Sequence, residues 1–241
     1  MVKRIEDLRI KIFADGAEKQ SILELNQLPY IKGFTTNPTL MRKAGITDYA
    51  GFAKDILSVI KDKPVSFEVF SDDFKEMERQ AKIIAGWADN VYVKIPITNT
   101  KRESSFDLVQ KLSREGIKLN VTAILAQSQV ENIRQAFSPK TSAIISVFAG
   151  RIADTGRDPV PIMKQIKEFL FPFKNLELLW ASPRELLNIF QADAIGCDII
   201  TVAPDILKKL EKVGFGLEEF SLETVKMFYE DGQKVGYSLY E

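Results

Sequence analysis

Two patterns of hydrophobic and polar positions alternate along the whole chain. Short apolar runs recur roughly every 20 to 35 residues, which is the length of one strand, one helix and two short loops. Between these runs, apolar residues have the spacing that is typical of amphipathic helices. The pattern predicts strands alternating with helices. The runs cover residues 8–14, 31–35, 65–70, 91–97, 119–124, 143–148, 176–181 and 199–203.

Two helix starts can be predicted from their capping residues. Asp72 and Asp73 precede one helical stretch, and acidic residues are favourable there because the first turn carries the positive end of the helix dipole. Ser182 and Pro183 precede another, where serine suits the N-cap and proline suits the first helical position. We therefore expect helices to begin at these two places.

Eight strands alternating with helices over 241 residues match a (β/α)8 TIM barrel, which typically takes about 250 residues. A doubly wound sheet usually needs fewer strands, and the chain contains neither G-x-G-x-x-G nor a P-loop sequence. Because no linker composition divides the chain, we expect one domain over residues 1–241, with 215–241 as a C-terminal helical extension. The amphipathic stretch 217–240 has two possible roles, packing on the outer helices of the barrel or contact between subunits.

The composition of the chain excludes several classes of catalytic and metal site. The chain has no histidine and one cysteine, which rules out Ser-His-Asp and Cys-His catalysis, His-ligated zinc and an intrachain disulfide. Its 33 Lys and Arg balance 33 Asp and Glu without a basic block, so nucleic acid is not an expected partner. The N-terminus lacks the apolar stretch of a signal peptide, and no run approaches the about 18 apolar residues of a membrane span. We expect a cytoplasmic protein without a membrane partner.

Polar residues near the carboxyl ends of the predicted strands are the first candidates for function, because TIM-barrel enzymes place their chemistry there. Lys94 lies in an otherwise apolar strand, and lysine is almost never buried without a partner or a role. Burial favours the neutral amine, which can attack a carbonyl and form a Schiff base. A structural salt bridge with Glu68 or Asp15 is an equally good interpretation of the residues alone.

Asp15 and Glu68 are expected to point into the same barrel mouth from the first and third strands. Carboxylates beside an amine can relay protons through water while a Schiff base forms. Counter-ions to Lys94 would satisfy the same pattern, and Asp15, which precedes Gly16, could also be a turn residue.

The next strand ends carry uncharged polar groups. Asn37 could hydrogen-bond a substrate hydroxyl, although Asn-Pro is also a common turn start and we favour the turn. Asn120 and Thr122 are two residues apart and share one face of a strand, and a polar pair facing a barrel interior favours function modestly. Ser146 occupies the equivalent end of the sixth strand.

Cations and a helix start near the last strands indicate an anion site. Ser182 and Arg184 should lie at the start of the helix after the seventh strand, where free N–H groups and a guanidinium suit a phosphate. Arg151 offers a second cation near the sixth strand. A salt bridge between Arg151 and Asp154 is an equally good interpretation.

Together these residues resemble the transaldolase family of class I aldolases, which use a lysine Schiff base. The resemblance covers about residues 12–207, some four-fifths of the chain, and the order of the motifs at strand ends makes it specific. The motifs are Phe13-Ala14-Asp15-Gly16, Gly33-Phe34-Thr35-Thr36-Asn37-Pro38, Val93-Lys94-Ile95-Pro96, Asn120-Val121-Thr122, Ile145-Ser146-Val147-Phe148-Ala149-Gly150-Arg151-Ile152 and Trp180-Ala181-Ser182-Pro183-Arg184.

The resemblance implies a role for each candidate residue. Lys94 would be the Schiff-base lysine, Asp15 the proton relay, and Glu68 and Thr122 the residues that position water. Donor hydroxyls would bind Asn37, Asn120 and Ser146, the phosphate would bind Arg151, Ser182 and Arg184, and Thr35 and Phe148 would complete the substrate site. The family chemistry implies no metal and no cofactor. Sugar phosphates are the expected partners, and a homo-oligomer with exchanged C-terminal helices is expected by analogy.

Two positions bear on the type of reaction. Related sugar-phosphate aldolases carry Gln in place of Glu68 and Tyr in place of Phe148, so the pair found here indicates transfer. Val147 replaces a usual proline, Pro183 replaces a common phenylalanine, and residues 154–159 add charge on the acceptor side.

We therefore expect a transaldolase of the pentose phosphate pathway type. It would move a dihydroxyacetone unit from a ketose phosphate, such as fructose 6-phosphate or sedoheptulose 7-phosphate, to an aldose phosphate. The alternatives are a fructose-6-phosphate aldolase-like enzyme, a transaldolase for an unusual sugar in a biosynthetic pathway, and a phosphosugar-binding barrel without catalysis.

Overall fold

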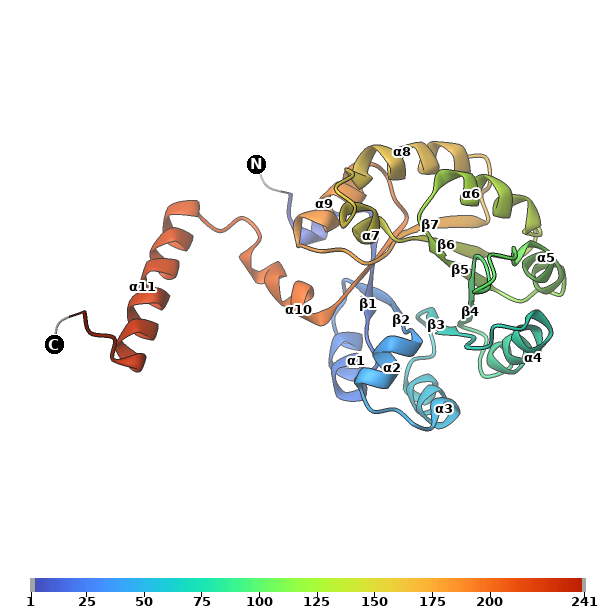
Figure 1. Ribbon diagram of the computed structural model, residues 1–241, viewed down its shortest axis with the longest axis horizontal. Helices are drawn as coiled ribbons and strands as arrows, with labels where there is room; N and C mark the ends of the chain where they lie inside the picture. Colours follow the sequence, from blue (N-terminus) through green and yellow to red (C-terminus); the bar gives the residue numbers. More distant parts are fainter. Residues whose placement is uncertain (1–2, 240–241) are drawn as a thin grey trace.

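The computed structural model describes residues 3–239. Over this range, eight parallel strands pair in sequence order and the last pairs with the first, which closes a barrel (Figure 1). The expected (β/α)8 barrel is therefore confirmed. The strands are β1 Lys11–Asp15, β2 Ile31–Thr35, β3 Val65–Glu68, β4 Val91–Pro96, β5 Leu119–Ile124, β6 Ala143–Val147, β7 Leu176–Trp180 and β8 Ile199–Val202.

Helices follow the strands and surround the barrel (Figure 1). They are α1 Lys19–Asn26, α2 Pro38–Lys43, α3 Tyr49–Val59, α4 Phe74–Ala85, α5 Phe106–Arg114, α6 Gln127–Ile133, α7 Ala149–Ala153, α8 Pro159–Leu170, α9 Leu187–Ala194, α10 Pro204–Leu207 and α11 Leu217–Val235. Three short 3-10 helices are η1 Ile5–Asp7, η2 Arg134–Ala136 and η3 Lys208–Lys212.

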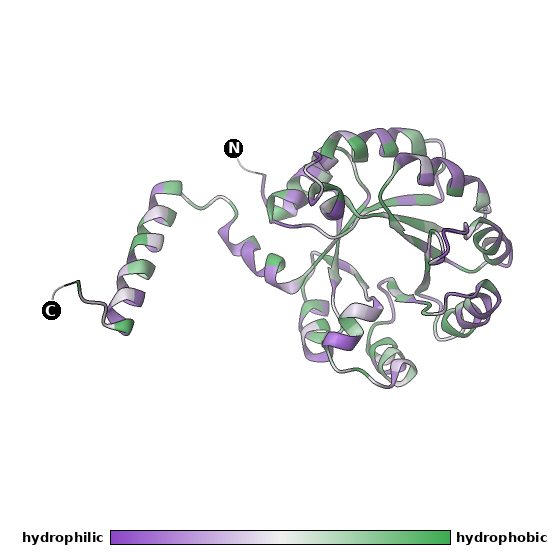
Figure 2. Cartoon of the chain, in the orientation of Figure 1, coloured by the Kyte–Doolittle hydropathy of each residue, from purple (hydrophilic) through white to green (hydrophobic). Residues whose placement is uncertain are grey.

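The core has two parts, because successive strand residues point to opposite faces of the sheet. The larger part lies between strands and helices, and Figure 2 shows hydrophobic residues concentrated on the strands. The smaller part is a cluster of Phe13, Ile144, Leu179, Ala181 and Ile199. Asp15 and Ser146 lie two residues beyond Phe13 and Ile144 on the same strands. The apolar cluster therefore supports a polar layer at the carboxyl ends of the strands.

Close packing inside the barrel explains the glycine in the second motif. A Cβ atom on Gly33 would lie 2.6 Å from Cζ of Phe13. Interiors packed at this density have no room for such an atom. Glycine at this position allows the Phe13 ring to fill the barrel beneath the polar layer.

Two predicted strands differ from the structure by more than one residue at an end. β1 begins at Lys11 rather than residue 8, and β3 ends at Glu68 rather than residue 70. After β3 the chain turns outward: Phe70 is 64% exposed, and its N–H donates to Gln80 Oε1. The predicted start of α4 is confirmed, because Asp73 is its N-cap and accepts from the N–H of Glu76 at 2.9 Å.

The predicted helix start at Ser182 is wrong. The chain leaves β7 in an irregular loop, Ser182 has a φ of 60°, and α9 begins at Leu187. The N–H groups of Arg184 and Glu185 donate to Oδ1 of Asn188, at 2.7 and 3.2 Å. Because Asn188 inside α9 satisfies these groups from the C-terminal side, the chain forms a loop where the capping pattern predicted helix.

The C-terminal helix α11 extends away from the barrel, to which α10 and η3 connect it (Figure 1). All its residues are exposed except Thr224 and Gly232, which are half-buried. The predicted helix is confirmed for Leu217–Val235, and Tyr240 lies outside the described residues. Packing of α11 on the outer helices of the barrel is not found among residues 3–239. The division of the chain at residue 215 stays a prediction.

No helix in the described range 3–239 is long and apolar enough to cross a membrane. The prediction about the N-terminus includes Met1 and Val2, which lie outside this range.

Candidate active site

The carboxyl ends of the strands surround a cavity of about 600 Å³. Eleven of the twelve predicted site residues line it, and Asn120 is the exception. The structure therefore brings together residues that are up to 169 positions apart in the sequence, from Asp15 to Arg184. The eleven are Asp15, Thr35, Asn37, Glu68, Lys94, Thr122, Ser146, Phe148, Arg151, Ser182 and Arg184.

Lys94 lies at the floor of this cavity on β4 and is only 6% exposed. Its Nζ lies 3.1 Å from Oε2 of Glu68 on the neighbouring strand β3. The same Nζ donates a hydrogen bond of 2.8 Å to the backbone carbonyl of Thr36. The predicted pairing with Glu68 is thus confirmed, and the two contacts hold the amine at a fixed place in the cavity.

Asp15 ends β1 and faces the same cavity. Thr35 Oγ1 donates to Asp15 Oδ1 at 2.8 Å. Burial raises the pKa of the Asp15 carboxyl above its usual value, while the Lys94 ammonium and the Thr35 hydrogen bond oppose the rise and Glu68 adds to it. A carboxyl in this balance is suited to accept and return a proton.

Asn120 does not line the cavity, although it was predicted to contact substrate. Its Nδ2 donates to Ser66 Oγ at 3.1 Å, and its Oδ1 accepts from Ser146 Oγ at 2.6 Å. Asn120 is fully buried and lies two residues before Thr122 on β5, further from the carboxyl end of the strand. Asn120 therefore holds Ser146, which does line the cavity, and its own contact with a substrate stays a prediction.

Thr122 reaches the cavity from a bulged part of β5. The pairing between β5 and β6 shifts between Val121 and Ile124, and Ala123 has a φ of 61°. Bulges of this kind re-aim side chains beside active sites. Within residues 3–239, the buried Oγ1 of Thr122 has no hydrogen-bond partner, so this hydroxyl is available to a substrate or to water.

Asn37 both caps a helix and lines the cavity. Its Oδ1 accepts from the N–H of Leu40 at 3.0 Å, which makes Asn37 the N-cap of α2 rather than a turn residue. It also lines the cavity. The cap uses Oδ1 and leaves the amide Nδ2 as a donor.

The rim of the cavity carries two arginines in different environments. The guanidinium of Arg184 makes a two-point contact with Asp154, in which Nε lies 2.9 Å from Oδ1. Arg151 has no ion-pair partner in the described part of the chain, and its guanidinium lies 5.4 Å from the centre of the Phe148 ring. The predicted pairing of Arg151 with Asp154 is therefore wrong. The pKa of Asp154 is held below its usual value mainly by the hydrogen bonds from Arg184.

Ser182 remains at the cavity rim although it caps no helix. Its carbonyl oxygen lies where a Cβ atom on Gly150 would be, at a distance of 1.5 Å. Glycine at position 150 therefore allows the α7 segment, which carries Arg151, to approach the loop that carries Ser182 and Arg184.

Sequence reasoning missed two polar residues of the cavity and one contact that bear on the site. Thr201 on β8 is buried and lines the cavity, Lys43 on α2 also lines it, and the Thr36 carbonyl accepts from Lys94. Thr201 lies two residues after Ile199, whose side chain faces the barrel interior. Because side chains alternate along a strand, this spacing predicts that Thr201 faces the interior as well. Lys43 is an ordinary last-turn lysine, and no sequence signal distinguishes it.

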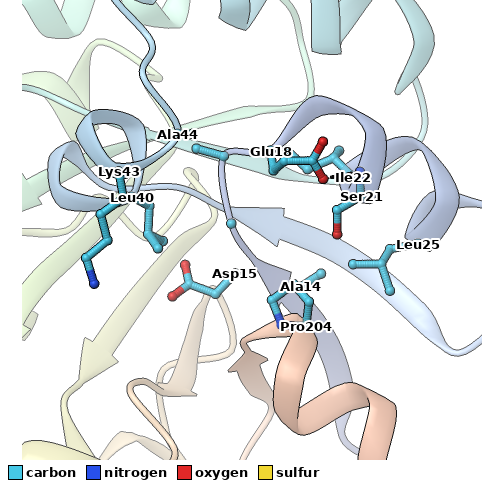
Figure 3. A pocket seen from close by; sticks show the side chains of 12 residues that line it. Ala14, Asp15, Glu18, Ser21, Ile22, Leu25, Leu40, Lys43, Ala44 and Pro204 are labelled. Atoms are coloured by element: carbon cyan, nitrogen blue, oxygen red, sulfur yellow. Dashed lines mark hydrogen bonds between the residues drawn. The ribbon is translucent and has the colours of Figure 1, made fainter.

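A second cavity of about 310 Å³ lies beside the first, between α1, α2 and the start of α10. Figure 3 shows apolar side chains such as Ile22, Leu25 and Leu40 around it, with Asp15 pointing toward the side where the Lys43 amine lies. The two cavities share Asp15, Leu40 and Lys43. Residues 3–239 contain no group of three or more acidic or cysteine side chains placed to hold a metal ion.

Solved structures with similar folds include 2,3-dimethylmalate lyase, at a TM-score of 0.54 and 12% identity, covering 98% of this chain and 87% of that one. A flavocytochrome b2 variant matches at a TM-score of 0.59 and 10% identity, covering 87% and 60% of the two chains. At these identities the likeness concerns the barrel fold alone.

Sequence comparisons are more specific. The family model described as "Transaldolase/Fructose-6-phosphate aldolase" matches residues 12–239. A "Probable transaldolase" of Brucella ovis is 33% identical over 94% of this chain and its own full length. A "Probable transaldolase" of Methanococcus vannielii is 34% identical over 88% of this chain and 95% of its own. The chain therefore belongs to the transaldolase/fructose-6-phosphate aldolase family.

Proposed function

We propose that the protein is a transaldolase that transfers a dihydroxyacetone unit between sugar phosphates through a Schiff base on Lys94. The observation that carries the proposal is the position of this amine, buried at the cavity floor and 3.1 Å from a carboxylate. A lysine so placed can pass a proton to its neighbour and attack a carbonyl as the neutral amine. Family membership and the names of the relatives support the same activity.

Formation of the Schiff base would begin when Nζ of Lys94 attacks C2 of a ketose phosphate. The C2 oxygen takes up a proton, and the resulting carbinolamine loses water to give a protonated imine. Glu68 lies at the amine and Thr122 has a free hydroxyl facing the cavity. These two residues and Asp15 are placed to hold the water that carries the protons.

Bond cleavage would use Asp15 as the base. Asp15 takes the proton from the C4 hydroxyl, the C3–C4 bond breaks, and its electron pair moves into the imine to give an enamine. An aldose phosphate leaves, and C3 of the enamine then attacks the aldehyde carbon of the acceptor. Asp15 returns its proton to the new hydroxyl, and hydrolysis releases the product from Lys94. Because the protonated imine accepts the electrons, the scheme needs neither a metal nor an organic cofactor.

Substrate binding would divide between two sides of the cavity. Asn37 and Ser146 offer hydrogen bonds to hydroxyls of the dihydroxyacetone unit, with Asn120 orienting Ser146. Arg151 and Arg184 offer positive charge at the rim, where Ser182 adds a hydroxyl, and this combination suits a phosphate. Fructose 6-phosphate and sedoheptulose 7-phosphate have the required ketose and phosphate ends.

Transfer is favoured over release by the residues beside the enamine. Phe148 lines the cavity and has no proton to give, and its ring lies against the Arg151 guanidinium. An enamine without a nearby proton donor persists until an aldehyde arrives. Glu68 remains beside Lys94 for the following hydrolysis step.

The protein would also form a homo-oligomer through α11. Its apolar side chains are exposed and unusually numerous for a free helix, and burying them would stabilise an assembly. They include Leu217, Phe220, Leu222, Val225, Met227, Phe228, Tyr229 and Val235. Light scattering would show a multimer for the wild type and a smaller species when Val225 and Phe228 are replaced by serine. A monomeric wild type would contradict this part of the proposal.

The activity itself can be tested by following labelled carbon. Fructose 6-phosphate labelled with carbon-13 at C1–C3 is incubated with an aldose phosphate acceptor, and the products are identified by NMR. Label in a new ketose phosphate supports transfer. Label only in free dihydroxyacetone would assign an aldolase instead, and unchanged donor across a panel of ketose phosphates would indicate a binding protein.

A further inference from the structure

A row of hydroxyl groups connects β8 to Asp15. Thr201 on β8 is 5% exposed, and its Oγ1 lies within hydrogen-bonding distance of Oγ1 of Thr35. Thr35, at the end of β2, donates in turn to Oδ1 of Asp15 at 2.8 Å. β1, which carries Asp15, lies between β2 and β8 in the barrel. Both strands beside Asp15 therefore contribute to one hydrogen-bonded row.

The direction of these hydrogen bonds follows from the number of protons. A threonine hydroxyl has one proton to donate and can accept through its oxygen. When Asp15 is ionised it only accepts, so the Thr35 proton goes to Asp15 and Thr35 must accept from Thr201. Successive hydrogen bonds of this kind polarise one another. Thr201 therefore strengthens the bond that Thr35 makes to the carboxylate.

The row engages only one oxygen of the carboxylate. Oδ1 of Asp15 accepts from Thr35, whereas Oδ2 has no hydrogen-bond partner within residues 3–239. Asp15 lines the site cavity, as does Thr201. A carboxylate that is fixed through one oxygen presents the other to a substrate hydroxyl in a constant orientation, which matters because small misplacements of a base are costly.

We propose that Thr201 is a positioning residue for Asp15, acting through Thr35 to fix the carboxylate with one oxygen free for proton transfer. The proposal rests on the role given to Asp15 under the proposed function. It adds a residue of β8 whose hydroxyl reaches Asp15 through Thr35 and thereby determines how the base is held.

The hydrogen bond from Thr35 sets the direction of the expected change in the pKa of Asp15. Burial raises its pKa, and the Thr35 hydrogen bond is one of the two interactions that lower it. Weakening that bond favours the protonated form, so the pKa rises further and less of the base is ionised at a given pH. The charged groups that line a cavity with Asp15 are Lys94 of β4, Glu68 of β3, Lys43 of α2, Glu18 before α1, and Arg151 and Arg184 at the rim. None of these is changed by a substitution at position 201.

The test compares Thr201→Val with Thr201→Ser. Valine keeps the shape of threonine and suits an apolar strand, but it removes the hydroxyl. We expect kcat to fall about 5-fold and the acid limb of the kcat/KM profile to move upward by about half a pH unit or more. Thr201→Ser restores both. Thr141→Val is the matched control, because Thr141 is a buried threonine that donates to the Ser113 carbonyl away from the cavity. It should lower the melting temperature without moving the pH profile.

A second measurement does not depend on turnover. Carbon-13 NMR of labelled aspartate carboxyls, with Asp15→Asn to assign the signal, follows the titration of Asp15 in each variant. An upward shift in Thr201→Val supports the proposal even if the wild type proves to catalyse another reaction. An Asp15 titration identical in wild type and Thr201→Val would overturn it, as would a Thr201→Ser variant that behaves like Thr201→Val.

Discussion

The floor of the active-site cavity lies on strands, and its rim near β7 lies on loops. On the floor, Lys94 is 6% exposed and is held by Glu68 and a backbone carbonyl. At the rim, the side chains of Arg184 and Asp154 are 45% and 53% exposed, and they contact each other. An exposed ion pair contributes little net free energy, so a phosphate can displace Asp154 from Arg184 at small cost. We therefore expect the floor to hold a fixed geometry, and the rim to exchange one anion for another.

The largest effect should come from removing the amine at the floor. Methionine is apolar and about as long as lysine. It suits a buried strand, so the barrel of Lys94→Met should still fold. Turnover should fall on the order of 10³-fold or more, because the nucleophile is lost. Steady-state assays and circular dichroism check the two halves of this prediction. Lys111→Met, on the exposed face of α5, is the control, and equal losses in both variants would contradict the role of Lys94.

At the rim, Arg184→Ala should weaken the binding of phosphorylated substrates more than the binding of substrates without phosphate. Losing a charge-assisted contact to an anion should lower kcat/KM by about 10- to 150-fold for a ketose phosphate. Free dihydroxyacetone as donor should be affected much less. Arg157→Ala removes an arginine that donates to Thr155 in the nearby loop and does not line the cavity. If Arg184→Ala lowered kcat/KM equally for both kinds of substrate, Arg184 would support the fold rather than bind phosphate.

A smaller change is expected where floor and rim meet, at Phe148. Phe148→Tyr adds a proton donor beside the enamine, and together with Glu68→Gln it should raise release of dihydroxyacetone relative to transfer by about 10-fold or more. The measurement is free dihydroxyacetone without acceptor against sugar exchange with acceptor. Phe148→Leu removes the ring without adding a hydroxyl and should not show this shift. A wild type that already releases dihydroxyacetone as fast as it transfers it would contradict the transfer mechanism.

The smallest effect should come from Asp154→Asn. The substitution removes the negative charge that competes with phosphate for Arg184, so the KM of a phosphorylated donor should fall by about 2- to 5-fold near neutral pH. Because Arg184 holds the pKa of Asp154 below its usual value, Asp154 stays charged down to acidic pH. The difference from wild type should therefore persist at pH 5. A higher KM in Asp154→Asn would mean that Asp154 orients Arg184 rather than competing for it.

The difference between floor and rim also explains what the sequence could predict. Floor residues lie at the ends of apolar strands, so the sequence predicts that Asp15, Glu68, Lys94 and Thr122 share one cavity, and all four line it. Asn120 lies two residues before Thr122, further from the carboxyl end of β5, and the pattern gives the face of a strand rather than the depth in the barrel. Thr201 was missed because threonine is common in strands and carries no charge.

At the rim, local sequence signals were misleading. Ser182 and Pro183 are typical of a helix start. The side chain of Asn188, however, accepts hydrogen bonds from the N–H groups of Arg184 and Glu185, and α9 begins later. Arg151 and Asp154 are close in sequence, yet Asp154 pairs with Arg184, which is 30 residues away. Loop contacts of this kind depend on tertiary structure, which no local pattern encodes. The amphipathic pattern of α11 likewise predicted a helix but not its separation from the barrel.

The central claim is that the buried amine at the cavity floor forms a Schiff base with a ketose. Sodium borohydride added during turnover of fructose 6-phosphate reduces such an imine to a stable adduct, which peptide mapping by mass spectrometry can locate. We expect a reduced ketose-derived adduct, of the whole donor or of its three-carbon unit, on the peptide that contains Lys94, and no adduct in Lys94→Met. An adduct on a different lysine, or wild-type protein that turns over substrate without any adduct, would contradict it.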